Sequence, residues 1–189
     1  MRGRMCKWTI AICTVYVRKG LLRRLLDRLE PQIGDRDIEI LIADQEDWPL
    51  AEKRQWCLDN AKGEYFNFID DDDLVAENYV EAIYPLLDGV DYIGFRLQYY
   101  HDGEPWKPTF HSLRYGVHAI YADSEGFYRG VSHLNPIRTE IARQGRYYGG
   151  YGEDNRWCAQ VNPVTEHYID QVMYHYYFSP ANSLTHGRQ

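Results

Sequence analysis

The sequence predicts an α/β protein in which a mixed sheet is flanked by helices within a single compact domain. Its length of 189 residues suffices for one domain with a hydrophobic core and is short for two domains of ordinary size. Apolar β-branched runs alternate with amphipathic helical patterns over residues 8–70, which predicts parallel strands joined by right-handed crossovers. Residues 115–130 are rich in aromatics and glycine, which is consistent with antiparallel strands or a shaped loop.

The first half of the chain has the clearest patterns. Residues 7–17 form a continuous apolar run, as expected of a strand that is buried on both faces. Residues 19–32 place leucines on one helical face, and Pro31 is expected to close this helix. The same reasoning predicts a strand over 37–44, a helix over 49–63 that Gly63 stops, and a strand over 64–70.

The second half is predicted from shorter and less regular patterns. We expect a helix near 76–87, a strand and turn over 91–106, and antiparallel strands or a shaped loop over 115–130. Short helices are expected over 135–144 and 152–161, and a final strand over 166–178.

Composition excludes several classes of protein. A net charge of -7 argues against a general nucleic-acid binder, which needs a basic excess to neutralise phosphates. The four cysteines are scattered without C-x-x-C spacing, so neither a zinc site nor a disulfide framework is indicated. No apolar run approaches the roughly 20 residues that a membrane span requires. We therefore expect a cytoplasmic protein without a membrane span.

Four consecutive aspartates, Asp70 to Asp73, follow the strand predicted over 64–70. A hard divalent cation bound by oxygen ligands is the simplest reason to gather carboxylates there. The structural alternative is that Asp72 or Asp73 caps a helix that begins near Leu74. A calcium loop is disfavoured, because Leu74 takes a ligand position and Val75 stands where the turn glycine belongs.

The predicted strand order also indicates where a ligand would bind. In parallel sheets flanked by helices, ligands bind beyond the carboxyl ends of the strands. Thr14, Asp44 and Asp70 stand at the ends of the first three predicted strands. We therefore expect these three residues to converge on one crevice.

Several stretches, taken in order, resemble family 2 glycosyltransferases with the GT-A fold. Residues 51–81 resemble the family's lysine-arginine helix, its A-x-G-E-Y strand and its D-x-D motif. Residues 150–157 resemble its glycine-glutamate-aspartate segment. The sequence departs from the family pattern at Val17 and Gln45, which affects details of base recognition. The matching stretches are residues 9–29, 38–47, 51–81, 150–157 and 173–186.

The resemblance implies an inverting transfer of a sugar from a nucleotide-diphosphate donor to an acceptor hydroxyl, assisted by Mn²⁺ or Mg²⁺. It implies a nucleotide-binding half over about 8–100 and an acceptor and catalytic half over about 101–189. The acceptor is a glycan, a protein side chain or a modified base, so nucleic acid enters only as an acceptor. The sugar, the nucleotide and the oligomeric state stay open.

The resemblance also implies roles for individual residues. Asp72 is the best metal ligand, Asp70 contacts the metal or the ribose, and Asp73 assists. The implied nucleotide contacts are Thr14, Asp44, Lys53, Asp70 and His186. The structural alternatives are that Thr14 merely ends its strand and that Lys53 is a solvated helix lysine.

The acceptor hydroxyl must lose its proton as it attacks, which requires a positioned base. Asp154 matches the family's base, and Glu153 is the alternative. The structural interpretation is that both acids simply open a helix near Asn155. The preceding glycine-rich stretch over 147–152 favours a closely approached loop over a plain cap.

Four further residues have predicted positions. His175 is expected to pack within the last strand, although either it or His186 could join the metal or diphosphate site. Trp106, His133 and Asn135 fall in the region that shapes the sugar and acceptor sites. Trp106 either stacks on a sugar or belongs to the core.

Two other functions remain open at this point. One is a viral DNA-modifying glycosyltransferase that acts on a hydroxylated base, for which the basic amino-terminal helix could contact phosphates. The other is a catalytically silent module that binds sugar-nucleotides or glycans. The presence of Asp70, Asp72, Glu153 and Asp154 favours an enzyme.

Overall fold

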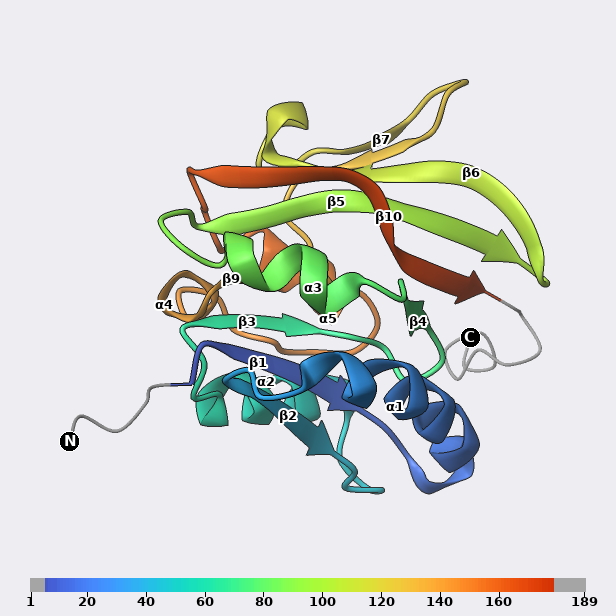
Figure 1. The fold of residues 1–189 in the computed structure, drawn as a ribbon, viewed down its shortest axis with the longest axis vertical. Coiled ribbons are helices and arrows are strands. Elements are labelled where there is room, and N and C mark those ends of the chain that lie inside the picture. Colours follow the sequence, from blue (N-terminus) through green and yellow to red (C-terminus); the bar gives the residue numbers. More distant parts are fainter. Residues whose placement is uncertain (1–5, 179–189) are drawn as a thin grey trace.

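The computed structural model describes residues 6–178, and Figure 1 shows their arrangement. The strands are β1 (Trp8–Cys13), β2 (Ile38–Ala43), β3 (Tyr65–Phe68), β4 (Leu74–Val75), β5 (Tyr92–His101), β6 (Glu104–His111), β7 (Ile120–Ala122), β8 (Phe127–Arg129), β9 (Ile137–Arg138) and β10 (Glu166–Phe178). The α-helices are α1 (Lys19–Ile33), α2 (Leu50–Asn60), α3 (Tyr79–Ile83), α4 (Thr139–Ala142) and α5 (Glu153–Cys158). Short 3-10 helices span Tyr16–Arg18, Tyr84–Leu86 and Leu113–Tyr115.

One mixed sheet runs through the molecule. β1 pairs in parallel with β2 and β3, as the alternating pattern predicts. β3 and β5 are both antiparallel to the short β9, which therefore joins the parallel half to the hairpin of β5 and β6. The long β10 lies parallel to β5 and also pairs with β4 (Figure 1). The predicted α/β class with a mixed sheet is confirmed.

The helices cover both faces of the sheet. Ile10 and Ile12 of β1 point to the face where α1 and α3 pack, while Ala11 points to the face covered by α2, α4 and α5. This alternation is the two-residue period of a strand, and both faces are apolar because both are buried. The burial of β1 on both faces therefore explains why residues 8–13 are almost all apolar.

Several predicted boundaries were wrong. The first strand ends at Cys13, and the predicted residues 15–17 leave the sheet for a 3-10 helix. Pro31 lies inside α1, whose last turn continues to Ile33 before Gly34. The missing N–H of Pro31 costs α1 one hydrogen bond, but the chain keeps its helical course for two more residues.

The end of α2 has a packing reason. The helix stops at Asn60, before the predicted Gly63. A Cβ atom on Gly63 would lie 2.3 Å from the backbone nitrogen of Thr9, so the chain must pass directly against β1 here. Only glycine allows this approach, which leads the chain into β3.

The aspartate run does not cap a helix. Leu74 and Val75 form β4 and pair with His175 and Tyr174 of β10, and the next helix begins only at Tyr79. The helix expected over 76–87 is therefore the short α3 followed by a 3-10 turn. The prediction that Asp72 or Asp73 caps a helix near Leu74 was wrong, because pairing with a distant strand outweighs the local preference.

The less regular second half follows the predictions more closely. The stretch over 115–130 contains the antiparallel pair β7 and β8. The stretches over 135–144 and 152–161 contain the short helices α4 and α5, and β10 is the predicted last strand. Within residues 6–178, every helix is too short or too polar to cross a lipid bilayer.

Candidate active site

A cleft of about 1130 Å³ opens at the carboxyl ends of β1 and β3. Thr14 and Asp70 both line it, as the topology predicts. Asp44 is exposed after β2 and does not line the cleft, whereas the next residues of the same loop, Glu46 to Trp48, do. α2 contributes Lys53 and Arg54, and the end of β10 contributes Tyr176 to Phe178.

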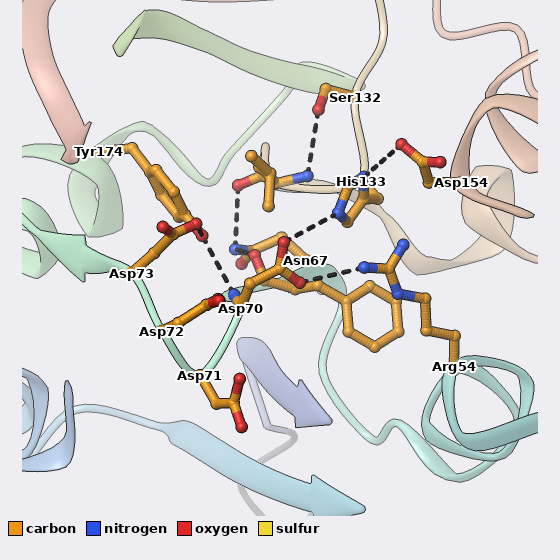
Figure 2. Close-up of polar contacts among 12 residues, drawn as sticks. Arg54, Asn67, Asp70, Asp71, Asp72, Asp73, Ser132, His133, Asp154 and Tyr174 are labelled. Carbon is orange, nitrogen blue, oxygen red and sulfur yellow. Dashed lines mark hydrogen bonds and ion pairs between the residues drawn. The ribbon is translucent and has the colours of Figure 1, made fainter. Parts of the chain in front are cut away.

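The four aspartates have four different surroundings (Figure 2). Asp71 is buried, where it accepts hydrogen bonds from the Thr14 hydroxyl at 2.7 Å and from Nη1 of Arg18 at 2.7 Å. Thr14 therefore holds the aspartate loop against the end of β1. Its hydroxyl has a protein partner in addition to its place on the cleft wall.

Asp73 turns away from the cleft. Its carboxylate accepts a hydrogen bond from the Tyr174 hydroxyl at 2.8 Å and another from the Tyr177 backbone N–H at 2.7 Å. Burial and the neighbouring Asp70 and Asp72 raise the pKa of Asp73 well above its ordinary value. Asp73, which directly precedes β4, therefore connects this strand to β10 through hydrogen bonds.

Asp70 faces two cationic or polar groups from other elements. Oδ1 accepts a hydrogen bond from Nη2 of Arg54 at 3.0 Å, and Oδ2 lies 3.8 Å from Nε2 of His133. Burial opposes ionisation, but Arg54, His133 and Arg18 together outweigh it and hold the pKa of Asp70 below its ordinary value. Asp70 is therefore ionised at neutral pH.

Asp72 is the member of the run that faces the cleft with the least compensation. Its side chain is 28% exposed, and Oδ2 lies 3.1 Å from Nη1 of Arg18. Burial and the negative charge of Asp70 raise the pKa of Asp72 to about 6, although Arg18 opposes the shift. A cation bound beside Asp72 would remove this electrostatic cost.

The two acids at the start of α5 also differ. Gly152 precedes the helix with a φ of 81°, a backbone conformation that favours glycine. Glu153 is buried against Nη1 of Arg54 at 3.0 Å. Asp154 is partly exposed, and its Oδ2 lies 3.4 Å from Nη2 of Arg129 and 3.6 Å from Nδ1 of His133. Both acids do open a helix, but only Asp154 is accessible.

The charge state of Asp154 follows from its neighbours. Burial would raise its pKa, but His133 and Arg129 hold the pKa of Asp154 below its ordinary value. Burial and the charge of Arg54 lower the pKa of His133, so the imidazole is neutral near pH 7. Asp154 is thus an ionised carboxylate that can accept a proton.

Lys53 is not the solvated lysine of the structural alternative. It is buried, and its Nζ donates a hydrogen bond to the carbonyl of Thr14 at 2.6 Å. The ammonium group therefore sits at the carboxyl end of β1, on the wall of the cleft.

Trp106 is 50% exposed and does not belong to the core. Its ring lies 5.3 Å from that of Tyr99, which stacks at 5.1 Å on Tyr176 of the cleft wall. A second hollow of about 420 Å³ is lined by His101, Glu104, Pro105 and Trp106. Aromatic rings thus run from the cleft to this hollow.

The acidic residues of the cleft suit a divalent cation that takes only one or two carboxylate ligands from the protein. In residues 6–178, no group of three or more His, Cys, Asp or Glu side chains is arranged to hold a metal ion. Mg²⁺ commonly uses one or two carboxylates and completes its shell with water and phosphate oxygens. Asp72 and Asp70 fit that pattern. His175 packs against Tyr100 within β10, as predicted, and His186 lies outside the described residues.

The sequence did not reveal the connecting residues. Arg54 bridges Asp70 and Glu153, and His133 lies between Asp70 and Asp154 (Figure 2). Arg54 directly follows Lys53 in the helix that resembles the family, so its position was a usable signal. His133 and Asn135 are buried beside the site, but no local pattern indicates which carboxylates His133 meets.

Comparisons with known proteins bear on the family and the fold. The model of glycosyl transferase family 2 matches residues 45–148, which is more than half of the chain. A search of curated proteins gives no significant match.

Solved structures of TarS from S. aureus share the fold. TarS 1-349 has a TM-score of 0.64 and 13% identity over 90% of this chain and 60% of its own. TarS 1-349 in complex with UDP-GlcNAc has a TM-score of 0.65 and 12% identity over 91% of this chain and 58% of its own. This chain therefore spans about 60% of the length of TarS 1-349. At such identities the likeness establishes the GT-A fold alone.

Proposed function

This chain belongs to glycosyl transferase family 2, and we propose that it transfers a sugar from a nucleotide-diphosphate donor to an acceptor hydroxyl with inversion at the anomeric carbon. The observation that carries the proposal is the arrangement of an accessible acid, Asp72, and an ionised acid, Asp154, around one buried network. Residues 8–100 would bind the nucleotide, and residues 101–189 would supply the base and the acceptor site.

The cleft is suited to a nucleotide diphosphate. Arg18, Arg24 and Lys53 line it and offer positive charge to the diphosphate, while Trp48 offers a ring to the base or ribose. That TarS 1-349 has been solved with UDP-GlcNAc supports a donor of this class. The predicted contacts of Asp44 and His186 with the nucleotide remain part of the proposal.

Mn²⁺ or Mg²⁺ would be held by Asp72, with Asp70 as the second carboxylate. A bound ion would neutralise the negative charge that develops on the leaving diphosphate. Asp71 and Asp73 take part by fixing the loop, since their carboxylates accept hydrogen bonds from Thr14 and Tyr174. The sequence-based role of Asp73 as a ligand is less well supported than that of Asp72, because Asp73 faces β10.

Asp154 is the proposed base. It is ionised, it is partly exposed, and it is held by Arg129 and His133. Glu153 is less suited to the role, because it is buried against Arg54. The negative charge of Glu153 instead balances the guanidinium that also holds Asp70.

A carbohydrate is the acceptor that the surface supports best. Trp106 exposes half of its surface, and flat aromatic rings pack well against the apolar faces of sugar rings. His101 and Glu104 beside it can hydrogen-bond to sugar hydroxyls.

The proposal is tested by screening UDP-, GDP-, TDP- and CDP-sugars with and without Mn²⁺ for thermal stabilisation, followed by mass spectrometry of the products. A ligand that binds only the folded state raises its apparent stability. Asp72→Asn should lower turnover by about 100-fold or more, and Asp154→Asn by about 100- to 10,000-fold while donor binding with Mn²⁺ persists.

Asp170→Asn is the matched control, because Asp170 is exposed on β10 and forms an ion pair with Arg96 at 3.4 Å, away from the cleft. It should retain full turnover. Full turnover in Asp154→Asn would refute the assignment of the base. Donor binding without either transfer or donor hydrolysis would indicate a silent binding module instead.

A further inference from the structure

The His133 imidazole lies between the aspartate loop and the start of α5 (Figure 2). Its Nε2 is 3.8 Å from Oδ2 of Asp70, and its Nδ1 is 3.6 Å from Oδ2 of Asp154. The side chain is 7% exposed. One ring therefore faces both the proposed metal-binding end and the proposed base.

The backbone around His133 is held firmly. Its carbonyl accepts a hydrogen bond from the Phe68 N–H at 2.8 Å, directly before the aspartate run. The next carbonyl, of Leu134, accepts one from the Asn67 side chain at 3.1 Å. The imidazole also packs against the Phe68 ring at 6.2 Å. The ring is thus held against β3 by the backbone on both sides of it.

Neither ring nitrogen of His133 has a hydrogen-bond partner in the part of the chain that the structure describes. A buried polar group without a partner destabilises the folded state, so such a group in a native structure calls for an explanation. Both carboxylates stand just beyond hydrogen-bond distance. A shift of either one would complete a bond.

A neutral imidazole has a single N–H, so it can donate to only one of the two carboxylates. Which nitrogen carries the proton is set by the bond that the other can make. If Asp70 is engaged by a cation or a nucleotide, the bond to Asp154 is the one that remains for His133.

His133 and Arg129 approach the same oxygen of Asp154. Nη2 of Arg129 is 3.4 Å from Oδ2, the atom that also faces Nδ1 of His133. Oδ1 receives neither contact. A carboxylate held through one oxygen from two sides presents its other oxygen in a fixed direction.

We infer that His133 is a positioning residue: with Arg129 it fixes Oδ2 of Asp154, so that Oδ1 accepts the proton of the acceptor hydroxyl. Because the neutral ring can donate to only one carboxylate, engagement of Asp70 by the donor or its cation directs this hydrogen bond to Asp154. The inference rests on the proposed function. It assigns the coupling between donor binding and the base to one side chain, which does not itself touch the reacting atoms.

Two substitutions distinguish the roles of the two ring nitrogens of His133. The Asn amide nitrogen can take the place of Nδ1, and the Gln amide nitrogen can take the place of Nε2. His133→Asn should therefore retain kcat within about threefold, while His133→Gln should lose roughly 10- to 100-fold in kcat because Asp154 is misoriented. The donor KM of His133→Gln should stay unchanged, since the cleft wall is intact.

His111→Gln is the matched control. His111 is also buried, and its Nδ1 lies 2.7 Å from Oδ1 of Asn135, away from the acids. It can lower the thermal stability as much as the His133 variants do, but kcat should remain at the wild-type level. Equal kcat in His133→Asn and His133→Gln would overturn the inference, as would a loss that follows thermal stability across all three variants.

A second readout does not depend on turnover. The ring ¹⁵N shifts of His133, measured in the wild-type protein with Mg²⁺ and UDP, should show the proton on Nδ1, and Asp154→Asn should change these shifts. A proton on Nε2 in the wild type would overturn the inference. Failure of the proposed function is seen separately, as absence of transfer and of donor hydrolysis by the wild-type protein.

Discussion

At the scale of single residues, Asp72 combines a functional role with a cost to stability. The folded state raises its pKa to about 6, above the ordinary value of 3.8, through burial and the charge of Asp70. A raised pKa in an acid means that the folded state binds the proton more tightly, so stability falls as pH rises from about 4 to about 6. At neutral pH the metal-free protein therefore carries an unfavourable charge.

Asp72→Asn should accordingly raise the melting temperature of the metal-free protein at pH 7. The rise in pKa from 3.8 to about 6 is about two units, which at about 1.4 kcal/mol per unit gives about 3 kcal/mol. Partial exposure reduces the expected gain to about 1 kcal/mol, or roughly 2–4 °C. Calorimetry at pH 7 and at pH 3.5 measures it, and the difference from wild type should vanish at the lower pH. A variant less stable than wild type at pH 7 would contradict this electrostatic account.

At the scale of elements, the joint between the aspartate loop and β10 depends on Tyr174. Its hydroxyl donates to Oδ2 of Asp73 at 2.8 Å and accepts from the Asp70 N–H at 3.1 Å. Tyr174→Phe removes the partner of Oδ2 of Asp73 and of the Asp70 N–H, which should lower the free energy of unfolding by about 1–3 kcal/mol in urea denaturation. Tyr121→Phe, on an exposed ring, should change it by less than about 0.5 kcal/mol. Equal effects would show that the joint contributes nothing.

The proposed acceptor site lies on the hairpin of β5 and β6, which contains Trp106. Trp106→Ala should raise the acceptor KM by about 10-fold through loss of ring stacking, while the donor KM stays constant in steady-state kinetics. Trp48→Ala, which alters the cleft wall, should show the opposite pattern. Unchanged acceptor KM in Trp106→Ala would exclude this ring from the acceptor site.

Elements with a strong local pattern were predictable from the sequence. The leucine face of α1 and the apolar runs of β1 and β3 reflect burial, which composition records directly. β4 was not predictable, because its two residues take their conformation from β10, about a hundred positions later in the chain. The aspartates beside it were therefore misread as a possible helix cap.

At the scale of the whole molecule, the site is built where distant segments meet. The sequence singled out candidate acids, and the topology brought Thr14 and Asp70 to one cleft as expected. Arg54 stands beside Lys53 in the matched helix, but the ion pairs that join Asp70 to α5 through Arg54 and His133 could not be predicted. They depend on how β9, α4 and α5 fold back across the sheet (Figure 1). Contacts of this kind leave no periodic signal in the sequence.

The central claim is that a divalent ion beside Asp72 meets the diphosphate of a donor within this cleft. The most direct measurement is a crystal structure with Mn²⁺ and whichever of UDP, GDP, TDP or CDP stabilises the protein most. The account predicts anomalous density for manganese within about 2.0–2.3 Å of a carboxylate oxygen of Asp72 and in contact with the diphosphate. Manganese and diphosphate bound away from Asp72, with the aspartates unchanged, would contradict it.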